Sequence, residues 1–235
     1  MSSQRQVRFG IVLGLTLSGA NVRAQGAGEA SFRAELALRY APIHEQEVHT
    51  RGSHALGGAA DYITSFDFDS DFDARNNRDH AGDSRYPLAA HAYYSVVETA
   101  SHWFITYQFF HPRDWSSTFF ETEHENDSEG VLLTVARDGS PFGALRAAVT
   151  VVHANFYSYV PPGSRWSSGQ ETVDGVLSLQ GYAGQLHPVF CDQKNGRRLL
   201  PVAHAGRGAV GAERPQRALS IARHARARRP LGAPQ

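Results

Sequence analysis

The chain has 235 residues, of which 41% are hydrophobic, enough for one sizeable domain with a buried core. Acidic and basic residues balance at 23 each, but residues 25–193 hold 22 of the acids and 10 of the bases, a net charge of −12. Such an acidic body excludes a nucleic-acid-coating function for the folded domain and suits cations. The single cysteine, Cys191, excludes an internal disulfide and a cysteine-based zinc site.

Residues 1–24 have the pattern of a secretory signal peptide. Arg5 and Arg8 form a basic start, residues 9–19 are apolar, and residues 22–24 (VRA) supply a small-residue cleavage site. The apolar run is too short to span a membrane. We therefore predict a secreted or periplasmic mature chain; an uncleaved N-terminal anchor is the alternative.

Short β-type segments follow a polar stretch, residues 25–34, that we predict to be a linker. No long segment shows a helical period. The domain over residues 35–192 is therefore predicted to be mainly β, an antiparallel β-sandwich with long loops and short helices at most. The predicted strands are Leu36–Ile43, Leu88–Val97, Trp103–Phe110, Val131–Ala136, Leu145–His153, Phe156–Val160, Val173–Tyr182 and Gln185–Phe190.

An unusual acidic stretch, DYITSFDFDSDFDARNNRDH, covers residues 61–80. Its aspartates alternate with phenylalanines, which predicts a strand edge that runs into a loop with the carboxylates on one face. Two interpretations stay open: a second cation site, or a solvated acidic loop. The spacing does not fit a helix-loop-helix calcium loop, because Phe72 stands where that loop needs glycine. The four aspartates are Asp67, Asp69, Asp71 and Asp73.

The most acidic segment is residues 111–131, HPRDWSSTFFETEHENDSEGV, between two apolar β-type segments. It holds six carboxylates, and Arg113 is its only Arg or Lys. Six acids so close together repel one another by about 1 kcal/mol per pair unless they are solvated or bind a cation. We therefore expect a divalent metal here, and the alternative is an acidic loop without one.

Four side chains of this segment are the predicted metal ligands: Asp114, His124, Asp127 and Glu129. Asp114 follows one predicted strand, whereas the other three enter the next, where Asp127 and Glu129 share a face. Mostly oxygen ligands favour Ca²⁺ or Mg²⁺ over zinc. His153, at the end of a predicted neighbouring strand, is a candidate for a ligand, a structural hydrogen bond or a catalytic base. His111 is a candidate for a cap of the strand end or a catalytic base.

The composition changes after residue 192. Residues 193–235 are rich in Arg, Ala, Gly and Pro, and we predict a basic disordered tail. Two interpretations stay open: a frameshifted end of the gene, or a basic arm that binds an anionic surface.

The motifs HPRDW and EHENDSEGVLLTV resemble the signature of the necrosis- and ethylene-inducing-like proteins, secreted cytolysins of plant-associated microbes. A related His-x-x-Asp-Trp-Glu element occurs in a vacuolar-sorting-associated family. The longer match, YYSVVETASHWFITYQFFHPRDW, is similar to a group of exported bacterial proteins. The resemblance covers residues 88–160 and implies a β-sandwich with calcium or magnesium at one end.

The resemblance also implies which residues hold the metal. The family's metal-site Asp falls on Asp114. The first His, the Asp and the Glu of its heptapeptide, Gly-His-Arg-His-Asp-Trp-Glu, fall on His124, Asp127 and Glu129. Its downstream strand His falls on His153. Four heptapeptide positions depart from the family: Glu123, Glu125, Asn126 and Ser128 stand where it has Gly, Arg, His and Trp. The family's disulfides are absent as well.

Three functions are compatible with these residues. The first is a secreted metal-binding protein that recognises a polar or glycosylated surface ligand, such as a surface glycan or lipid head group, with membrane activity as one form of it. The second is a metal-dependent hydrolase with His153 or His111 as base. The third is an exported structural domain stabilised by calcium.

Overall fold

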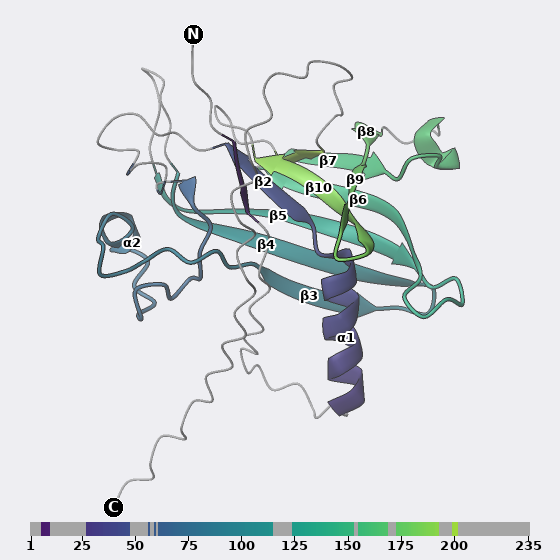
Figure 1. The fold of residues 1–235 in the computed structure, drawn as a ribbon, viewed down its shortest axis with the longest axis horizontal. Coiled ribbons are helices and arrows are strands. Elements are labelled where there is room, and N and C mark those ends of the chain that lie inside the picture. The colour runs from purple at the N-terminus through teal and green to yellow at the C-terminus, as the bar shows by residue number, and fades with distance from the viewer. Residues whose placement is uncertain are drawn as a thin grey trace, which may run out of the picture.

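The computed structural model describes residues 6–9, 27–47, 56, 59, 61–114, 124–152, 155–168, 173–192 and 199–201. In this part of the chain, two β-sheets form a sandwich, as the sequence predicts (Figure 1). The larger sheet has six strands in the order β3-β4-β5-β6-β7-β8. They are β3 (Tyr93–Glu98), β4 (His102–Asp114), β5 (His124–Ala136), β6 (Ala144–Val152), β7 (Asn155–Val160) and β8 (Gly175–Val176).

The smaller sheet joins the two ends of the chain. Its strands are β1 (Gln6–Phe9), β2 (Ile43–Glu47), β9 (Ser178–Tyr182), β10 (Gln185–Asp192) and β11 (Leu199–Pro201). β10 is the hub, because it pairs in parallel with β2 and antiparallel with β9 and β11. β1 lies inside the predicted signal peptide and β11 inside the predicted tail, so short pieces of both are paired in this sheet.

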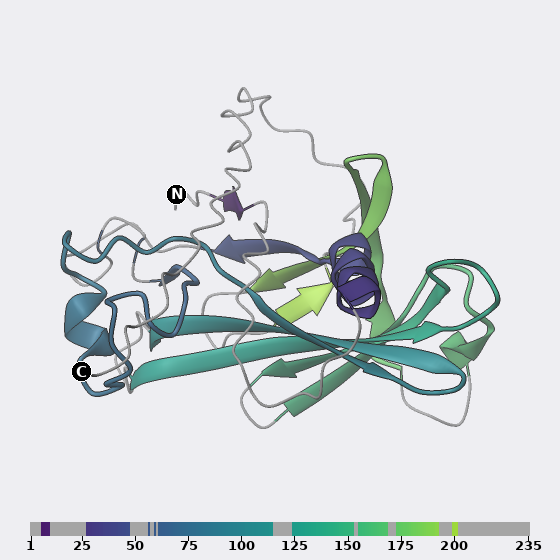
Figure 2. The same cartoon turned by 90° about the horizontal axis from the view of Figure 1, so that it is seen from below.

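Helix α1 (Ala27–Tyr40) closes one side of the sandwich, as Figure 2 shows with the helix seen end-on. Phe32, Leu36 and Tyr40 lie four residues apart and pack into the core. The single O–H of Tyr40 is shared between the carbonyl oxygens of Phe142 and Gly143, which lie 3.0 and 2.9 Å from the hydroxyl oxygen. The prediction of a strand over Leu36–Ile43 is therefore wrong up to Tyr40, and residues 27–34 belong to this helix rather than to a linker.

The other strand predictions agree in position, with differences at their ends, except for Val173–Tyr182. That segment is split into β8 in the larger sheet and β9 in the smaller one. β4 runs four residues beyond its predicted end at Phe110, and β5 starts seven residues before Val131. Much of the acidic segment, residues 111–131, is thus strand, because β4 and β5 stay paired as far as Asp114 and His124. Residues 61–76 are turns rather than a strand edge, with an isolated bridge at Thr64, and α2 (Asn77–His80) follows them.

The core is a single apolar cluster between the two sheets and α1. Its most buried large side chains include Tyr107, Phe109 and Phe190, from β4 and β10. Among the described helices, none has the length and apolar character needed to cross a membrane.

Candidate cation sites

The inner face of the β4–β5 pair turns from apolar to polar toward one end. Alternate residues of a strand share a face. On this face, β4 continues from its buried apolar residues to His111, and β5 carries Glu129 and Asp127 next to Val131. Glu129 and Asp127 are only 2% and 7% exposed. A buried carboxylate needs a basic side chain or a bound cation beside it, so this end of the core differs from its apolar remainder.

His111 is fixed inside this polar end. Its side chain is fully buried, and its Nδ1 lies 3.1 Å from the carbonyl oxygen of Asp61. A carbonyl only accepts, so Nδ1 carries a proton in this contact. Gln46 of β2 approaches the same nitrogen at 3.5 Å. This buried hydrogen bond connects β4 to the backbone at residue 61, which is a structural role for His111. Its role as a catalytic base stays a prediction.

His44 of β2 is a second buried histidine in this region. Its ring is fully buried and packs on Phe109, with centroids 4.4 Å apart. Neither ring nitrogen has a hydrogen-bond partner among the described residues. Burial lowers the pKa of His44 to about 4, so the imidazole is neutral at pH 7.

The backbone register places the four predicted ligands on one strand pair, but spread along it. Asp114 is paired with His124, whereas Asp127 is paired with His111 and Glu129 with Phe109. At Asp114 and His124 only the backbone is described, and His153 lies outside the described residues. Convergence of the four side chains on one cation therefore stays a prediction.

In the other acidic stretch, residues 61–80, aspartate side chains accept hydrogen bonds from the backbone of the same loop. The side chain of Asp69 accepts the backbone N–H of Asp71, Asp71 accepts that of Asp73, and Asp73 accepts that of Arg75. Each contact reaches two residues along the chain, which is the pattern of an Asx turn. Ser70, with φ +73°, adds a left-handed residue to this winding. The prediction that the four aspartates share one strand face is therefore wrong.

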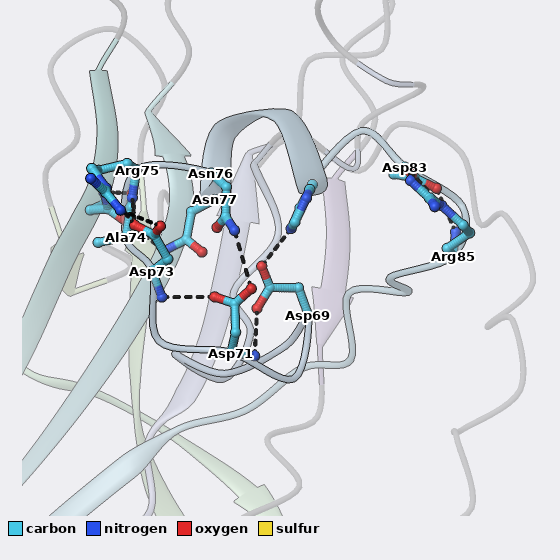
Figure 3. A network of polar contacts seen from close by, with 11 residues as sticks. Asp69, Asp71, Asp73, Ala74, Arg75, Asn76, Asn77, Asp83 and Arg85 are labelled. Atoms are coloured by element: carbon cyan, nitrogen blue, oxygen red, sulfur yellow. Dashed lines mark hydrogen bonds and ion pairs between the residues drawn. The ribbon is translucent and has the colours of Figure 1, made fainter.

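The structure brings together Asp69, Asp71 and His80 as a group that could hold a metal ion. Figure 3 shows the two aspartates facing each other in this loop. The ligand atoms of the three residues all lie within 4.8 Å of one another, and these residues are the single such group among the described side chains. The Asp69 side chain is fully buried, and its Oδ2 lies 2.6 Å from Nδ1 of His80. A divalent cation could replace the proton between these two atoms. Two carboxylates and one imidazole are a donor set that several divalent metals accept.

The other two aspartates of this stretch are engaged elsewhere. Asp73 forms an exposed ion pair with Arg75 at 2.7 Å, and hydrogen bonds from Arg75 lower the pKa of Asp73 to about 2. Asp67 lies near His91, whose pKa is lowered by burial and partly restored by the charge of Asp67. The structure therefore reduces the predicted set of four to Asp69 and Asp71, and adds His80. The sequence analysis missed His80, although it ends the same acidic stretch.

Asparagines connect this loop to the β4–β5 hairpin. Asn77 of α2 donates from Nδ2 to Oδ1 of Asn126 on β5 at 2.6 Å. Asn126 in turn donates to the carbonyl of Ala74 at 2.7 Å, with a left-handed backbone at φ +62°. We call the region formed by residues 61–80, 109–113 and 125–129 the acidic end. It holds both the Asp69–Asp71–His80 group and the buried carboxylates of β5.

Comparison with known proteins gives similarity at the level of solved structures. No family model and no curated protein matches the sequence. A structure described as "Toxin fold for microbial attack and plant defense" is 17% identical, with a TM-score of 0.36, and the match covers 66% of this chain and 65% of that one. "NLPPya in complex with glucosamine" is 15% identical, with a TM-score of 0.35, covering 67% and 66%. "Crystal structure of non-toxic HaNLP3 protein" is 15% identical, with a TM-score of 0.34, covering 67% and 73%.

This chain thus spans slightly less than two thirds of the first two matched chains. The matched structures are NLP proteins, that is, necrosis- and ethylene-inducing-like proteins, the family that the central motifs of this sequence resemble.

Proposed function

We propose that this protein is an exported β-sandwich that binds a divalent cation at its acidic end and uses it to hold a polar or glycosylated surface ligand. The observation that carries the proposal is the group of ligand atoms of Asp69, Asp71 and His80 within 4.8 Å. The net charge of −12 over residues 25–193 adds a field that attracts cations.

The donor count explains how the cation would hold a ligand. Asp69, Asp71 and His80 offer three atoms, whereas Mg²⁺ takes six ligands and Ca²⁺ six to eight. The remaining positions belong to water or to ligand oxygens. Sugar hydroxyls and the phosphate of a lipid head group are oxygen donors of the hard type that these ions prefer.

Export follows from the predicted signal peptide, and the choice of Ca²⁺ or Mg²⁺ from the predominance of oxygen donors. The predicted ligands Asp114, His124, Asp127 and Glu129 offer a competing place for the same ion at the acidic end. Mutations therefore have to separate the two groups.

The test is metal binding by the purified chain, measured by elemental mass spectrometry and by thermal unfolding with Ca²⁺, Mg²⁺, Mn²⁺ or Zn²⁺. A cation at 100 times its dissociation constant stabilises the fold by about 2.7 kcal/mol, or roughly 5–10 °C in Tm. Asp71→Asn should abolish the shift. Asp73→Asn is the matched control, because it removes the same charge from a carboxylate already paired with Arg75.

Three outcomes separate the alternatives. Loss of the shift in Asp71→Asn alone supports the Asp69–Asp71–His80 site. Loss of the Tm shift in Glu129→Gln alone would indicate that the cation binds at the other predicted group, Asp114, His124, Asp127 and Glu129. Absence of bound metal in the wild type would refute the proposal. Binding to a glycan array or to anionic lipid vesicles should then disappear with EDTA; a cation shift without any such binding leaves a stabilising role.

A further inference from the structure

A groove lies at the end of the larger sheet opposite to the acidic end. It is lined by His102, the first residue of β4, and by Arg146 of β6, whereas Phe110 and His111 lie near the other end of β4. The loop after β7 and the 3-10 helix η2 (Arg165–Ser168) form its other wall. Its volume is about 910 Å³, a size that accommodates a small organic ligand. In Figure 1 this wall lies far from α2.

The charge of the groove is opposite to that of the body. Arg146 and Arg165 are both exposed and both line it, and no Asp or Glu is among its described lining residues. Asp138 interacts electrostatically with Arg146 but is not among the residues that line the groove. Hydrogen bonds from Ser140 lower the pKa of Asp138, and Arg146 lowers it further. Two guanidinium groups at the wall of a groove attract anions, which the acidic end repels.

An aromatic platform stands beside these charges. The Arg165 guanidinium lies over the Trp166 ring, 4.7 Å from its centroid, yet Trp166 remains 58% exposed. The turn before it is well defined, because Ser164 donates its N–H to Pro161 at 3.1 Å and accepts that of Trp166 on its hydroxyl at 3.2 Å. A large exposed indole that is held this firmly is available to stack on a ring.

We propose that this groove is a binding site for an anionic sugar ring, in which the apolar face of the ring stacks on Trp166 and its carboxylate pairs with Arg146 and Arg165. Arg165 would bind the carboxylate of the sugar and also contact the indole, since its guanidinium already lies over the Trp166 ring. Planar guanidinium groups bind carboxylates through two parallel hydrogen bonds. The proposal is independent of the cation site, because no residue is shared between the two.

Three probes dissect the two components of recognition. D-glucuronate has both the ring and the carboxylate, D-glucose has the ring alone, and acetate has the carboxylate alone. Binding is followed by NMR through the indole N–H signal that disappears in Trp166→Phe. We expect the dissociation constant of glucuronate to be at least ten times lower than those of glucose and acetate. Because the arginines are exposed, 0.5 M NaCl should weaken glucuronate binding several-fold.

Variants test which side chains are responsible. Arg165→Gln and Arg146→Gln should each weaken glucuronate about tenfold and leave glucose unchanged. Arg85→Gln is the matched control outside the groove, since Arg85 also lies over an aromatic ring, at 5.4 Å from the Tyr86 centroid. Equal affinity for glucuronate and acetate would reduce the groove to a simple anion site and refute the sugar assignment. Unchanged affinity in both groove variants would refute the site.

Discussion

Replacing Tyr107 with Phe tests how α1 is attached to the larger sheet. Tyr107 is fully buried on β4, and its hydroxyl donates to the carbonyl of Ala37 at 2.6 Å. Ala37 is in the last turn of α1, where carbonyl groups lack a partner within the helix. The tyrosine hydroxyl therefore satisfies one end of the helix from the neighbouring sheet.

The expected cost follows from the group that is left behind. Tyr107→Phe removes the donor and leaves a buried carbonyl without it, which costs about 1–3 kcal/mol. For a domain of this size, about 2 kcal/mol corresponds to a fall in Tm of roughly 4–8 °C. Tyr94→Phe is the matched control: Tyr94 is the register partner of Tyr107 on β3, but it is only half-buried and its hydroxyl has no described hydrogen bond. Its change should stay within about 0.5 kcal/mol.

The pH dependence gives a second, independent readout. Burial raises the pKa of Tyr107 well above 10, so the folded state needs the protonated phenol. The stability that this provides is complete below pH 10 and is lost as the pH rises, because the unfolded chain then releases the proton. At pH 11 the loss is on the order of 1 kcal/mol. Urea unfolding should therefore show a gap between wild type and Tyr107→Phe that is large at pH 7 and narrow at pH 11. A variant as stable as wild type at pH 7, or a constant gap, would refute the reasoning.

Further predictions concern a buried histidine, a glycine and the chain start. Folding keeps His44 neutral with a pKa of about 4, so its contribution to stability is full above pH 6.5 and falls by about 3 kcal/mol as the pH drops to 4; His44→Phe should remove most of this acid sensitivity in urea unfolding. Gly143→Ala should lower the free energy of unfolding by more than about 2 kcal/mol in the same assay, because Gly143 has φ +69° and a Cβ would lie 2.2 Å from the Ala136 carbonyl oxygen. Gly139→Ala is the control and should lower it less, because Gly139 also has a positive φ, +92°, but its Cβ would meet nothing within 4 Å. Removal of the predicted signal peptide should give a chain that begins at Gln25 in Edman sequencing; a sequence beginning before residue 6 would show that the leader and β1 are retained.

The β-sandwich could be predicted because its strands carry strong local signals. Between residues 93 and 160, aromatic and β-branched residues alternate with polar ones, and short turns separate the runs. The pairing β3-β4-β5-β6-β7 follows chain order, so these local signals were sufficient for this sheet. The smaller sheet pairs segments from both ends of the chain, and no local pattern indicates such partners.

The errors also have physical causes. The helical spacing of Phe32, Leu36 and Tyr40 was present, but the apolar run at Leu36–Ile43 was read by itself as a strand. Alternating Asp and Phe from residue 66 to 73 imitates a strand, yet aspartate side chains bind the backbone two residues ahead and wind it into turns. His80 was missed because its partnership with Asp69 depends on that winding.

Pairing of β2 with β10 has a consequence for the order in which the chain can fold. His187 of β10 binds the carbonyl of Ala41 across 146 residues of sequence. The hairpins of the larger sheet can form during synthesis, but the edge of β2 that faces β10 has no strand partner until β10 emerges. A chain that stops before Gln185 would leave this edge open to aggregation.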